Sequence, residues 1–209
     1  MISPVRGEGD RLVLLDQTRL PSEEIERAYT SWTEVAEAIR SLVVRGAPAI
    51  GVTAAFGVAL AARESRAIAF DGLLADVETA IKGLAATRPT AVNLFWALER
   101  MRRCCLDHRT LPLDALKARL AQEAQAVLDE DVAANRAMGP HGVALVPDGA
   151  RILTHCNAGA LATAGYGTAG GVIRAAHAQG KVQLVWVDET RPVLQGARLT
   201  AWECVKEGI

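Results

Sequence analysis

Apolar residues in the first two thirds of the chain recur with the spacing of amphipathic helices. Ser31 followed by Glu34 has the pattern of a capping box, which predicts a helix over residues 31–42. Pro48 suits the first turn of a second helix, which is predicted over residues 48–63. The amino-terminal part of the chain is therefore expected to be mainly helical.

Three more helices are predicted before residue 146. Asp71 is expected to cap the third, and Leu111-Pro112 begins a long fifth helix that reaches about residue 138. Residues 87–90 introduce the fourth, in which four apolar residues recur at roughly helical spacing: Val92, Phe95, Trp96 and Met101. A short strand pair around residues 11–15 precedes all of these helices.

The pattern changes near residue 147. Residues 150–154 and 182–187 are short apolar runs that flank a glycine-rich helix start, which is typical of a β-α-β unit. The predicted fold class is α/β, with a mainly helical domain at residues 1–146 and the start of a Rossmann-like parallel domain at residues 147–209. Because two strands make a poor parallel sheet, the second domain is expected to be incomplete in this chain.

Composition and charge narrow the possible partners. Half of the 209 residues are apolar, and 23 Lys and Arg stand against 24 Asp and Glu. This balance excludes the positive excess typical of proteins that bind nucleic acid or anionic membranes. The amino terminus lacks the apolar core of a signal peptide, and residues 50–62 are too short and too glycine-interrupted for a membrane span. We expect a cytoplasmic protein with no nucleic-acid and no membrane partner.

Residues 165–170, GYGTAG, match the dinucleotide-binding pattern G-x-G-x-x-G, and Asp188 stands roughly where such folds hold a ribose. In that pattern the first glycine follows the strand directly. Here the eight residues 157–164 intervene between the strand end and Gly165. A nicotinamide or flavin role is therefore disfavoured.

Cys156 stands at the carboxyl end of the first parallel strand, where open α/β sheets bind ligands. It is either a catalytic group or a small core side chain, and position alone favours neither. His155 points to the other face of the strand and is interpreted as a packed or hydrogen-bonded core histidine. The other three cysteines, Cys104, Cys105 and Cys204, are expected in the core. No metal site is expected, because no C-x-x-C spacing occurs.

Two stretches place an arginine directly before a helix opened by proline, VRGAPAIG around Arg45 and TRPTAVN around Arg88. Unpaired backbone N–H groups and a guanidinium converge there, which suits a phosphate. Gly46 and Ala47 leave room for a ligand to approach the main chain. Either arginine alone could be a surface side chain, but two such stretches together favour a phosphate site.

A third stretch, ETRPVLQG, follows the second parallel strand at the same edge of the sheet. Gln195 could offer a donor and an acceptor to a sugar hydroxyl, or it could be an ordinary polar loop residue. Asp188 and Glu189 are interpreted as structural carboxylates that pair with Arg191.

Four motifs in this order resemble the methylthioribose-1-phosphate isomerases: VRGAPAIGVTAAFG, TRPTAVNLFWAL, ILTHCNAGALATAGYGTAGGVIRAA and VDETRPVLQGARLTAWE. The opening LLDQTRLP resembles that family as well. The resemblance implies an aldose–ketose isomerase of methionine salvage that acts on a sugar phosphate without a metal or organic cofactor. It also implies a helical domain joined to a Rossmann-like domain, in a homodimer.

Residue by residue, the resemblance makes Cys156 the catalytic cysteine. It makes the substrate-binding residues Arg45, Gly46, Ala47, Arg88 and Gln195. The family's catalytic aspartate and an Asn-Lys pair correspond to positions beyond residue 209, so these 209 residues alone are expected to have little or no isomerase activity.

Two alternatives share the architecture. One is an isomerase of ribose 1,5-bisphosphate or 5-deoxyribose 1-phosphate. The other is a non-enzymatic regulatory subunit of the translation-initiation guanine-nucleotide exchange factor. The cysteine in THCNAG, together with the RGAPA and TRPTAVN motifs, argues against the non-enzymatic alternative.

Overall fold

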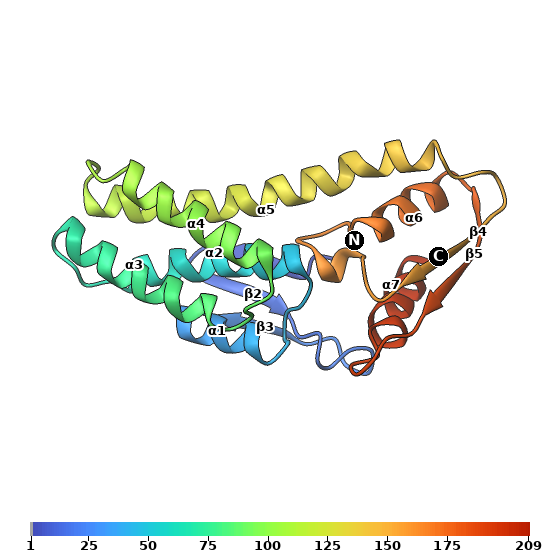
Figure 1. The fold of residues 1–209 in the computed structure, drawn as a ribbon, viewed down its shortest axis with the longest axis horizontal. Helices are drawn as coiled ribbons and strands as arrows, with labels where there is room; N and C mark the ends of the chain where they lie inside the picture. Colours follow the sequence, from blue (N-terminus) through green and yellow to red (C-terminus); the bar gives the residue numbers. More distant parts are fainter. Residues whose placement is uncertain (1) are drawn as a thin grey trace.

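A helical bundle with a small sheet forms one end of the molecule, and a β-α-β unit forms the other (Figure 1). The structure is a computed structural model that describes residues 2–209. Its helices are α1 (Trp32–Arg40), α2 (Ala47–Glu64), α3 (Phe70–Ala85), α4 (Val92–Asp107), α5 (Leu113–Val143), α6 (Ala169–Ala178) and α7 (Ala201–Glu207). Its strands are β1 (Val5–Glu8), β2 (Arg11–Leu15), β3 (Glu26–Tyr29), β4 (Ala150–His155) and β5 (Val182–Asp188). Two short turns complete the order, the 3₁₀ turn η1 (Ala160–Ala162) and the π-helical turn η2 (Gly196–Thr200).

Helix α2 is the centre of the bundle, with α1, α3, α4 and α5 packed around it. It is apolar on nearly every side and is built largely from alanine, glycine and valine. A Cβ added at Gly51 would lie 2.8 Å from the backbone oxygen of Asn93, so only glycine allows α4 to approach this closely. The packing fixes the position of the α2 amino terminus, where the candidate site lies.

Several predicted helix starts are confirmed. Ser31 and Glu34 form the capping box of α1, with the Glu34 N–H donating to the Ser31 hydroxyl at 3.3 Å. Pro48 lies in the first turn of α2, as predicted. The prediction for Asp71 is wrong, because the residue that caps α3 is Ala69 and Asp71 lies inside the first turn, where its charge suits the helix dipole.

The buried residues of α4 are mostly not the four apolar residues whose spacing predicted the helix. Val92, Phe95 and Trp96 are 76%, 43% and 51% exposed, and of the four only Met101 is fully buried. The helix turns another face to the core, composed of Leu94, Ala97, Leu98, Met101, Cys104 and Cys105. The two adjacent cysteines are therefore core side chains, as expected.

The small sheet has the order β1-β2-β3 and is antiparallel. The predicted strand pair around residues 11–15 is confirmed, and β3 is an additional strand with mostly exposed residues, which explains why apolar patterning did not reveal it. Residues 12–15 of β2 are buried, and the buried polar residues Asp16 and Gln17 follow directly.

The predicted β-α-β unit is confirmed: β4 and β5 pair in parallel, and α6 connects them. The long helix α5 reaches over this unit, because a Cβ added at its Gly142 would lie 2.5 Å from Val172 of α6 (Figure 1). α5 ends at Val143 and β4 begins at Ala150, so the change near residue 147 falls in a loop. The division into two domains at residue 146 stays a prediction.

The strands leave large side chains exposed, with Leu153 66% and Trp186 54% exposed. The interpretation of His155 as a core histidine is wrong for the same reason. Its side chain is 69% exposed, and its Nδ1 lies 3.6 Å from the carboxylate of Asp188. No element within residues 2–209 covers this face of the two strands. In the same residues, no helix is long and apolar enough to cross a membrane.

Candidate functional site

A cavity of about 720 Å³ lies where the bundle meets the β-α-β unit. We call it the arginine cleft. All five residues predicted to bind substrate line it, although they come from three separate segments. Its lining is Gln17, Thr18, Ser41, Leu42, Arg45, Gly46, Ala47, Ile50, Arg88, Thr90, Ala91, Val193, Gln195, Arg198 and Leu199.

The first predicted segment enters the cleft at the amino terminus of α2. Gly46 has a φ of 94°, which favours glycine, and a Cβ there would lie 2.4 Å from the backbone oxygen of Ala162. Gly46 is also the N-cap of α2, and no side chain caps the helix. The start of α2 therefore presents backbone N–H groups and a positive helix end beside the cleft.

Arg45 is held by the loop that follows β4. Its Nη1 donates to Oδ1 of Asn157 at 2.6 Å. Burial lowers the pKa of Arg45, an effect that the nearby Cys156 and Glu203 oppose and that Arg88 reinforces. Two guanidinium groups and the predicted catalytic thiol thus lie close enough to influence one another, which is the charge arrangement expected of an anion site.

Arg88 differs from Arg45 in its partners. Its Nη1 is buried and has no hydrogen-bond partner within residues 2–209. Buried donors are nearly always paired in folded proteins, so an unpaired guanidinium N–H in a cavity points to a ligand that is an acceptor.

Cys156 lies at the carboxyl end of β4, as predicted, but does not itself line the arginine cleft. It is half-buried and has a φ of 59°, in the left-handed region that non-glycine residues rarely adopt. The hydroxyl of Thr200 donates to its backbone oxygen. The next residue is Asn157, the partner of Arg45, so the strained backbone at Cys156 sets the direction in which the loop leaves the strand.

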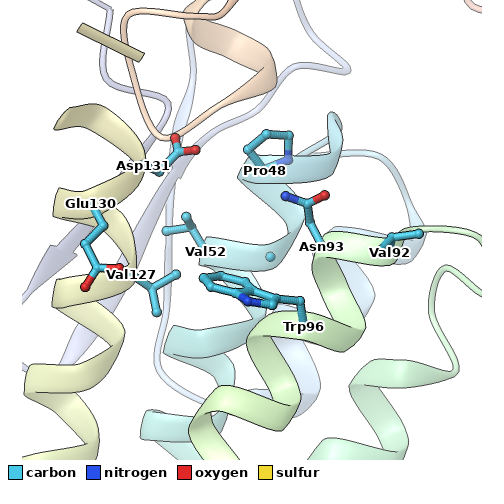
Figure 2. Close-up of a pocket in the computed structure, with 9 residues that line it drawn as sticks. Pro48, Val52, Val92, Asn93, Trp96, Val127, Glu130 and Asp131 are labelled. Atoms are coloured by element: carbon cyan, nitrogen blue, oxygen red, sulfur yellow. The ribbon is translucent and has the colours of Figure 1, made fainter. Parts of the chain in front are cut away.

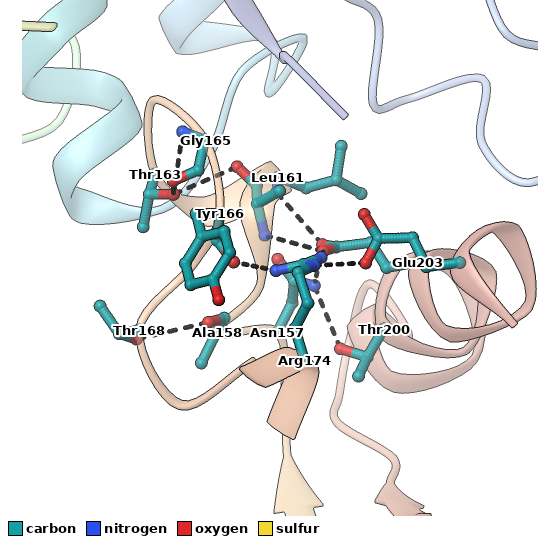
Figure 3. A network of polar contacts seen from close by, with 12 residues as sticks. Asn157, Ala158, Leu161, Thr163, Gly165, Tyr166, Thr168, Arg174, Thr200 and Glu203 are labelled. Atoms are coloured by element: carbon teal, nitrogen blue, oxygen red, sulfur yellow. Dashed lines mark hydrogen bonds and ion pairs between the residues drawn. The ribbon is translucent and has the colours of Figure 1, made fainter. Parts of the chain in front are cut away.

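A buried carboxylate holds this loop in place (Figure 3). Glu203 of α7 is 4% exposed and accepts from the N–H groups of Ala160 and Leu161 at 2.7 and 3.1 Å. The amide of Asn157 donates to the same carboxylate at 2.9 Å. Burial raises the pKa of Glu203, against the effect of these donors. Sequence reasoning missed Glu203, because the loop residues that it holds lie more than 40 positions earlier in the chain.

The glycine-rich stretch serves the same loop. The backbone oxygen of Ala158 accepts from the N–H groups of Thr168 and Gly170, at 2.9 and 3.1 Å, at the start of α6. A Cβ added at Gly170 would lie 2.7 Å from the Cα of Gly159. The helix end that would hold a pyrophosphate in a dinucleotide site is therefore filled by the chain's own loop, and the glycines form the setting of Cys156.

The loop after β5 brings Gln195 into the cleft. The hydroxyl of Thr190 donates to the Gln195 Oε1 and orients the amide. Glu189 is structural, as predicted, but it accepts from the N–H groups of Gly196 and Ala197, both at 3.0 Å. The prediction that Glu189 pairs with Arg191 is wrong, because its partners are backbone N–H groups. These donors lower the pKa of Glu189, and the charge of Arg191 adds only a smaller lowering.

Two further cleft residues, Arg198 and Gln17, are absent from the sequence prediction. Arg198 donates to the backbone oxygens of Val193, Gln17 and Thr18, each at 3.0 Å, and so ties the Gln195 loop to the segment after β2. The clue to Gln17 is its place within LLDQTRLP, where polar residues directly follow a buried strand.

A second cavity, of about 450 Å³, opens on the other side of the α2 start, between α2, α4 and α5 (Figure 2). Its walls are mostly apolar, and its charged residues are the carboxylates Glu130 and Asp131. Burial raises the pKa of Asp131. With carboxylates and no cationic side chain in its lining, this cavity does not suit a phosphate. Within residues 2–209, no group of three or more His, Cys, Asp or Glu side chains could hold a metal ion.

Residues 43–209 match the model of the initiation factor 2 subunit family. The chain belongs to this family. The family match covers the α2 start, the Cys156 loop and the Gln195 loop, and so includes most of the arginine cleft.

Relatives named methylthioribose-1-phosphate isomerase are similar over the whole chain. The one from Geobacter sulfurreducens is 58% identical over 205 residues, which are 98% of this chain and 59% of the relative. The one from Syntrophotalea carbinolica is 57% identical over 208 residues, 100% of this chain and 60% of the relative. The resemblance that the motifs indicated is thus confirmed, and the chain spans about three fifths of the length of these relatives.

Two crystal structures confirm the α/β fold class. The 5-methylthioribose 1-phosphate isomerase from Pyrococcus horikoshii OT3 matches with a TM-score of 0.94 and 47% identity, over 100% of this chain and 58% of that one. Subunit delta of the translation initiation factor eIF-2B from A. fulgidus matches with a TM-score of 0.89 and 42% identity, over 100% of this chain and 61% of that one. Fold alone therefore does not separate the two functions.

Proposed function

We propose that the protein containing this chain is a methylthioribose-1-phosphate isomerase, which converts 5-methylthioribose 1-phosphate to 5-methylthioribulose 1-phosphate in methionine salvage. The arginine cleft carries the proposal, because Arg45, Arg88 and Gln195 come from separate segments yet line one cavity beside the Cys156 loop. The names of the relatives from Geobacter sulfurreducens and Pyrococcus horikoshii support it.

The chemistry explains why this site needs a strong anion anchor. The anomeric carbon of the substrate carries the phosphate, so the ring cannot open spontaneously to a free aldehyde. An acid must protonate the ring oxygen, and a hydrogen must then move from C2 to C1. C1 is reduced as C2 is oxidised, so the reaction is redox-neutral and requires no external oxidant or reductant. We accordingly propose no metal and no organic cofactor.

Each site residue predicted from the sequence has a proposed role. Arg88 and the backbone at Gly46 and Ala47 bind the phosphate, with Arg45 beside them. Gln195 binds a sugar hydroxyl. Cys156 takes part in the hydrogen transfer at C1 and C2, with further groups supplied by the rest of the full-length protein.

The regulatory-subunit alternative draws on the similarity to the A. fulgidus protein. A binding subunit has no need of a buried, unpaired arginine N–H in a polar cavity, and the unpaired Arg88 Nη1 therefore favours a sugar-phosphate enzyme. Isomerases of ribose 1,5-bisphosphate or 5-deoxyribose 1-phosphate would use the same anion anchor, and they are distinguished by substrate in the assay below.

The finer proposals concern the whole protein. We propose a cytoplasmic homodimer without a nucleic-acid or membrane partner, in keeping with the balanced charge of 23 basic and 24 acidic residues.

The test is an NMR assay of the full-length protein with 5-methylthioribose 1-phosphate, ribose 1,5-bisphosphate and 5-deoxyribose 1-phosphate. Turnover is expected to be fastest with the first sugar. Cys156→Ser should lower kcat by about 100-fold or more, the range of positioned proton transfer. Cys204→Ser, which changes another half-buried cysteine outside the arginine cleft, is the matched control and should leave kcat unchanged. Full turnover in Cys156→Ser would remove the proposed role.

A further inference from the structure

Gln17 is held rigidly at the edge of the arginine cleft. It is 2% exposed and follows directly after β2. Its N–H donates to the backbone oxygen of Val43 at 3.0 Å, and its own backbone oxygen accepts from Arg198 at 3.0 Å. The backbone on both sides of the side chain is thus fixed by the bundle and by the Gln195 loop.

The orientation of the Gln17 amide is determined by its partner. Its Nε2 donates to the backbone oxygen of Leu161 at 2.8 Å. Because a carbonyl oxygen can only accept, the NH₂ group must face Leu161, and Oε1 must be the other end of the amide. Oε1 is buried and has no hydrogen-bond partner within residues 2–209.

Two of the three unpaired buried side-chain atoms among residues 2–209 belong to residues that line this cavity. Within residues 2–209, three buried side-chain polar atoms have no partner: Gln17 Oε1, Thr53 Oγ1 and Arg88 Nη1. Gln17 and Arg88 both line the arginine cleft, whereas Thr53 is enclosed within the bundle. One cavity is therefore lined by two residues that carry an unpaired acceptor and an unpaired cationic donor, and this pair matches a ligand that carries a hydroxyl and an anionic group.

We propose that Gln17 Oε1 accepts a hydrogen bond from a ring hydroxyl of the sugar phosphate, and that Gln17 thereby selects ligands that carry this hydroxyl. The inference rests on the proposed function and names a residue to which the family motifs give no role. Gln17 binds the hydroxyl with one end of its amide and the turn that contains Leu161 with the other. The N–H of Leu161 is bonded to Glu203, so Gln17 positions the sugar relative to the carboxylate that holds the Cys156 loop.

The experiment measures binding rather than turnover. The full-length protein is titrated calorimetrically with 5-methylthioribose 1-phosphate, its 2-deoxy and 3-deoxy analogues and inorganic phosphate. The wild type is expected to bind one deoxy analogue about 10-fold or more weakly than the parent sugar, since that analogue leaves Oε1 unpaired. Gln17→Met keeps the side-chain length but removes both hydrogen bonds. It should weaken binding of the parent sugar by a similar factor and no longer discriminate against that analogue.

Two controls separate selection from structure. Binding of inorganic phosphate should be unchanged in Gln17→Met, and Gln125→Met, the same change at a half-buried position of α5 outside the arginine cleft, should alter none of these affinities. Equal weakening for both sugars and for phosphate would mean that Gln17 is only structural, and undiminished discrimination in Gln17→Met would overturn the proposal.

A spectroscopic measurement on the wild type covers the case in which Gln17→Met fails to fold. The side-chain carbonyl ¹³C resonance of Gln17 should shift with the parent sugar and not with inorganic phosphate, and an unmoved resonance would overturn the proposal. A wild type that binds and discriminates between the sugars but shows no turnover would contradict the proposed function and leave the role of Gln17 intact.

Discussion

The two arginine segments have similar sequences but different structures. In the first, α2 begins at Ala47, directly after Gly46, and proline lies in its first turn. In the second, α4 begins only at Val92, and a turn closed by the Ala91 N–H to the Arg88 oxygen at 3.2 Å comes between. The prediction that both arginines directly precede a proline-opened helix is therefore right for Arg45 and wrong for Arg88.

The difference indicates that the two arginines have different roles in the cleft. Arg45 is bonded to Asn157 and is part of the network that ends at Glu203, whereas Arg88 keeps a buried N–H without a partner. One arginine is already held by the protein and shapes the site. The other has a buried donor that no group within residues 2–209 satisfies, which leaves it free to bind a ligand.

The largest effect is expected where the Arg45 segment touches η1. Gly46→Ala places a Cβ against the backbone of Ala162 at a φ of 94°, so strain and overpacking add. The free energy of unfolding should fall by about 3 kcal/mol or more, measured by denaturant titration. Gly9→Ala is the control, because Gly9 has a φ of 61° with open space around it, and it should cost only about 1 kcal/mol. Equal losses at the two glycines would refute the close approach to Ala162.

The next effect tests the network behind Arg45. Glu203→Gln replaces one acceptor oxygen by an NH₂ group that faces backbone N–H donors, and the free energy of unfolding should fall by about 2–3 kcal/mol. The control is Glu130→Gln, which changes an exposed ion pair with Arg100 and should cost at most about 1 kcal/mol. A Glu203→Gln protein as stable as the control would show that the carboxylate does not hold the loop.

Substitutions of the two arginines should differ in their effects on ligand affinity and on the free energy of unfolding. Arg88→Ala should weaken binding of 5-methylthioribose 1-phosphate to the full-length protein by about 10- to 100-fold, while the free energy of unfolding stays within about 0.5 kcal/mol of wild type. Arg45→Ala should lower both quantities, because it leaves the buried oxygen of Asn157 unpaired. Arg109→Ala, an exposed change on the loop after α4, is the control for charge. The same pattern in both cleft variants would remove the distinction drawn above.

The smallest effect concerns the turn that precedes the cleft. Burial alone would raise the pKa of Asp16, but hydrogen bonds from Thr18 and Arg27 outweigh it and lower the pKa below its ordinary value. The stabilisation is therefore present at neutral pH and is lost as the pH falls through the acid range. Asp16→Asn should cost about 1 kcal/mol at pH 7 and less at pH 3, in thermal unfolding across that range. A penalty that grows on acidification would contradict the sign.

The sequence predicted those parts of the site that local patterns encode. Gly46 and Pro48 indicate a helix start whose backbone a ligand can approach. Cys156 follows an apolar run that indicates a strand, so its place at the end of that strand could be predicted. Glu203 and Gln17 were missed because their meaning depends on partners far along the chain: the amide of Gln17 is bonded to a residue 144 positions away. No periodicity carries such information.

Side-chain exposure is the second feature that the sequence did not predict. The sequence places Trp96 on a helix and His155 on a strand correctly, but both side chains are exposed because no described element covers those faces. Helical or strand periodicity assigns the element, whereas burial depends on which neighbours pack against it.

The most direct test is a crystal structure of the full-length protein with 5-methylthioribose 1-phosphate. A phosphate oxygen is predicted within hydrogen-bond distance of Arg88 Nη1 and of the backbone N–H groups at the start of α2, with C1 and C2 of the sugar toward Cys156. A ligand in the cavity beside Trp96 and Asp131, or an Arg88 Nη1 that stays unpaired with the sugar bound, would contradict the account.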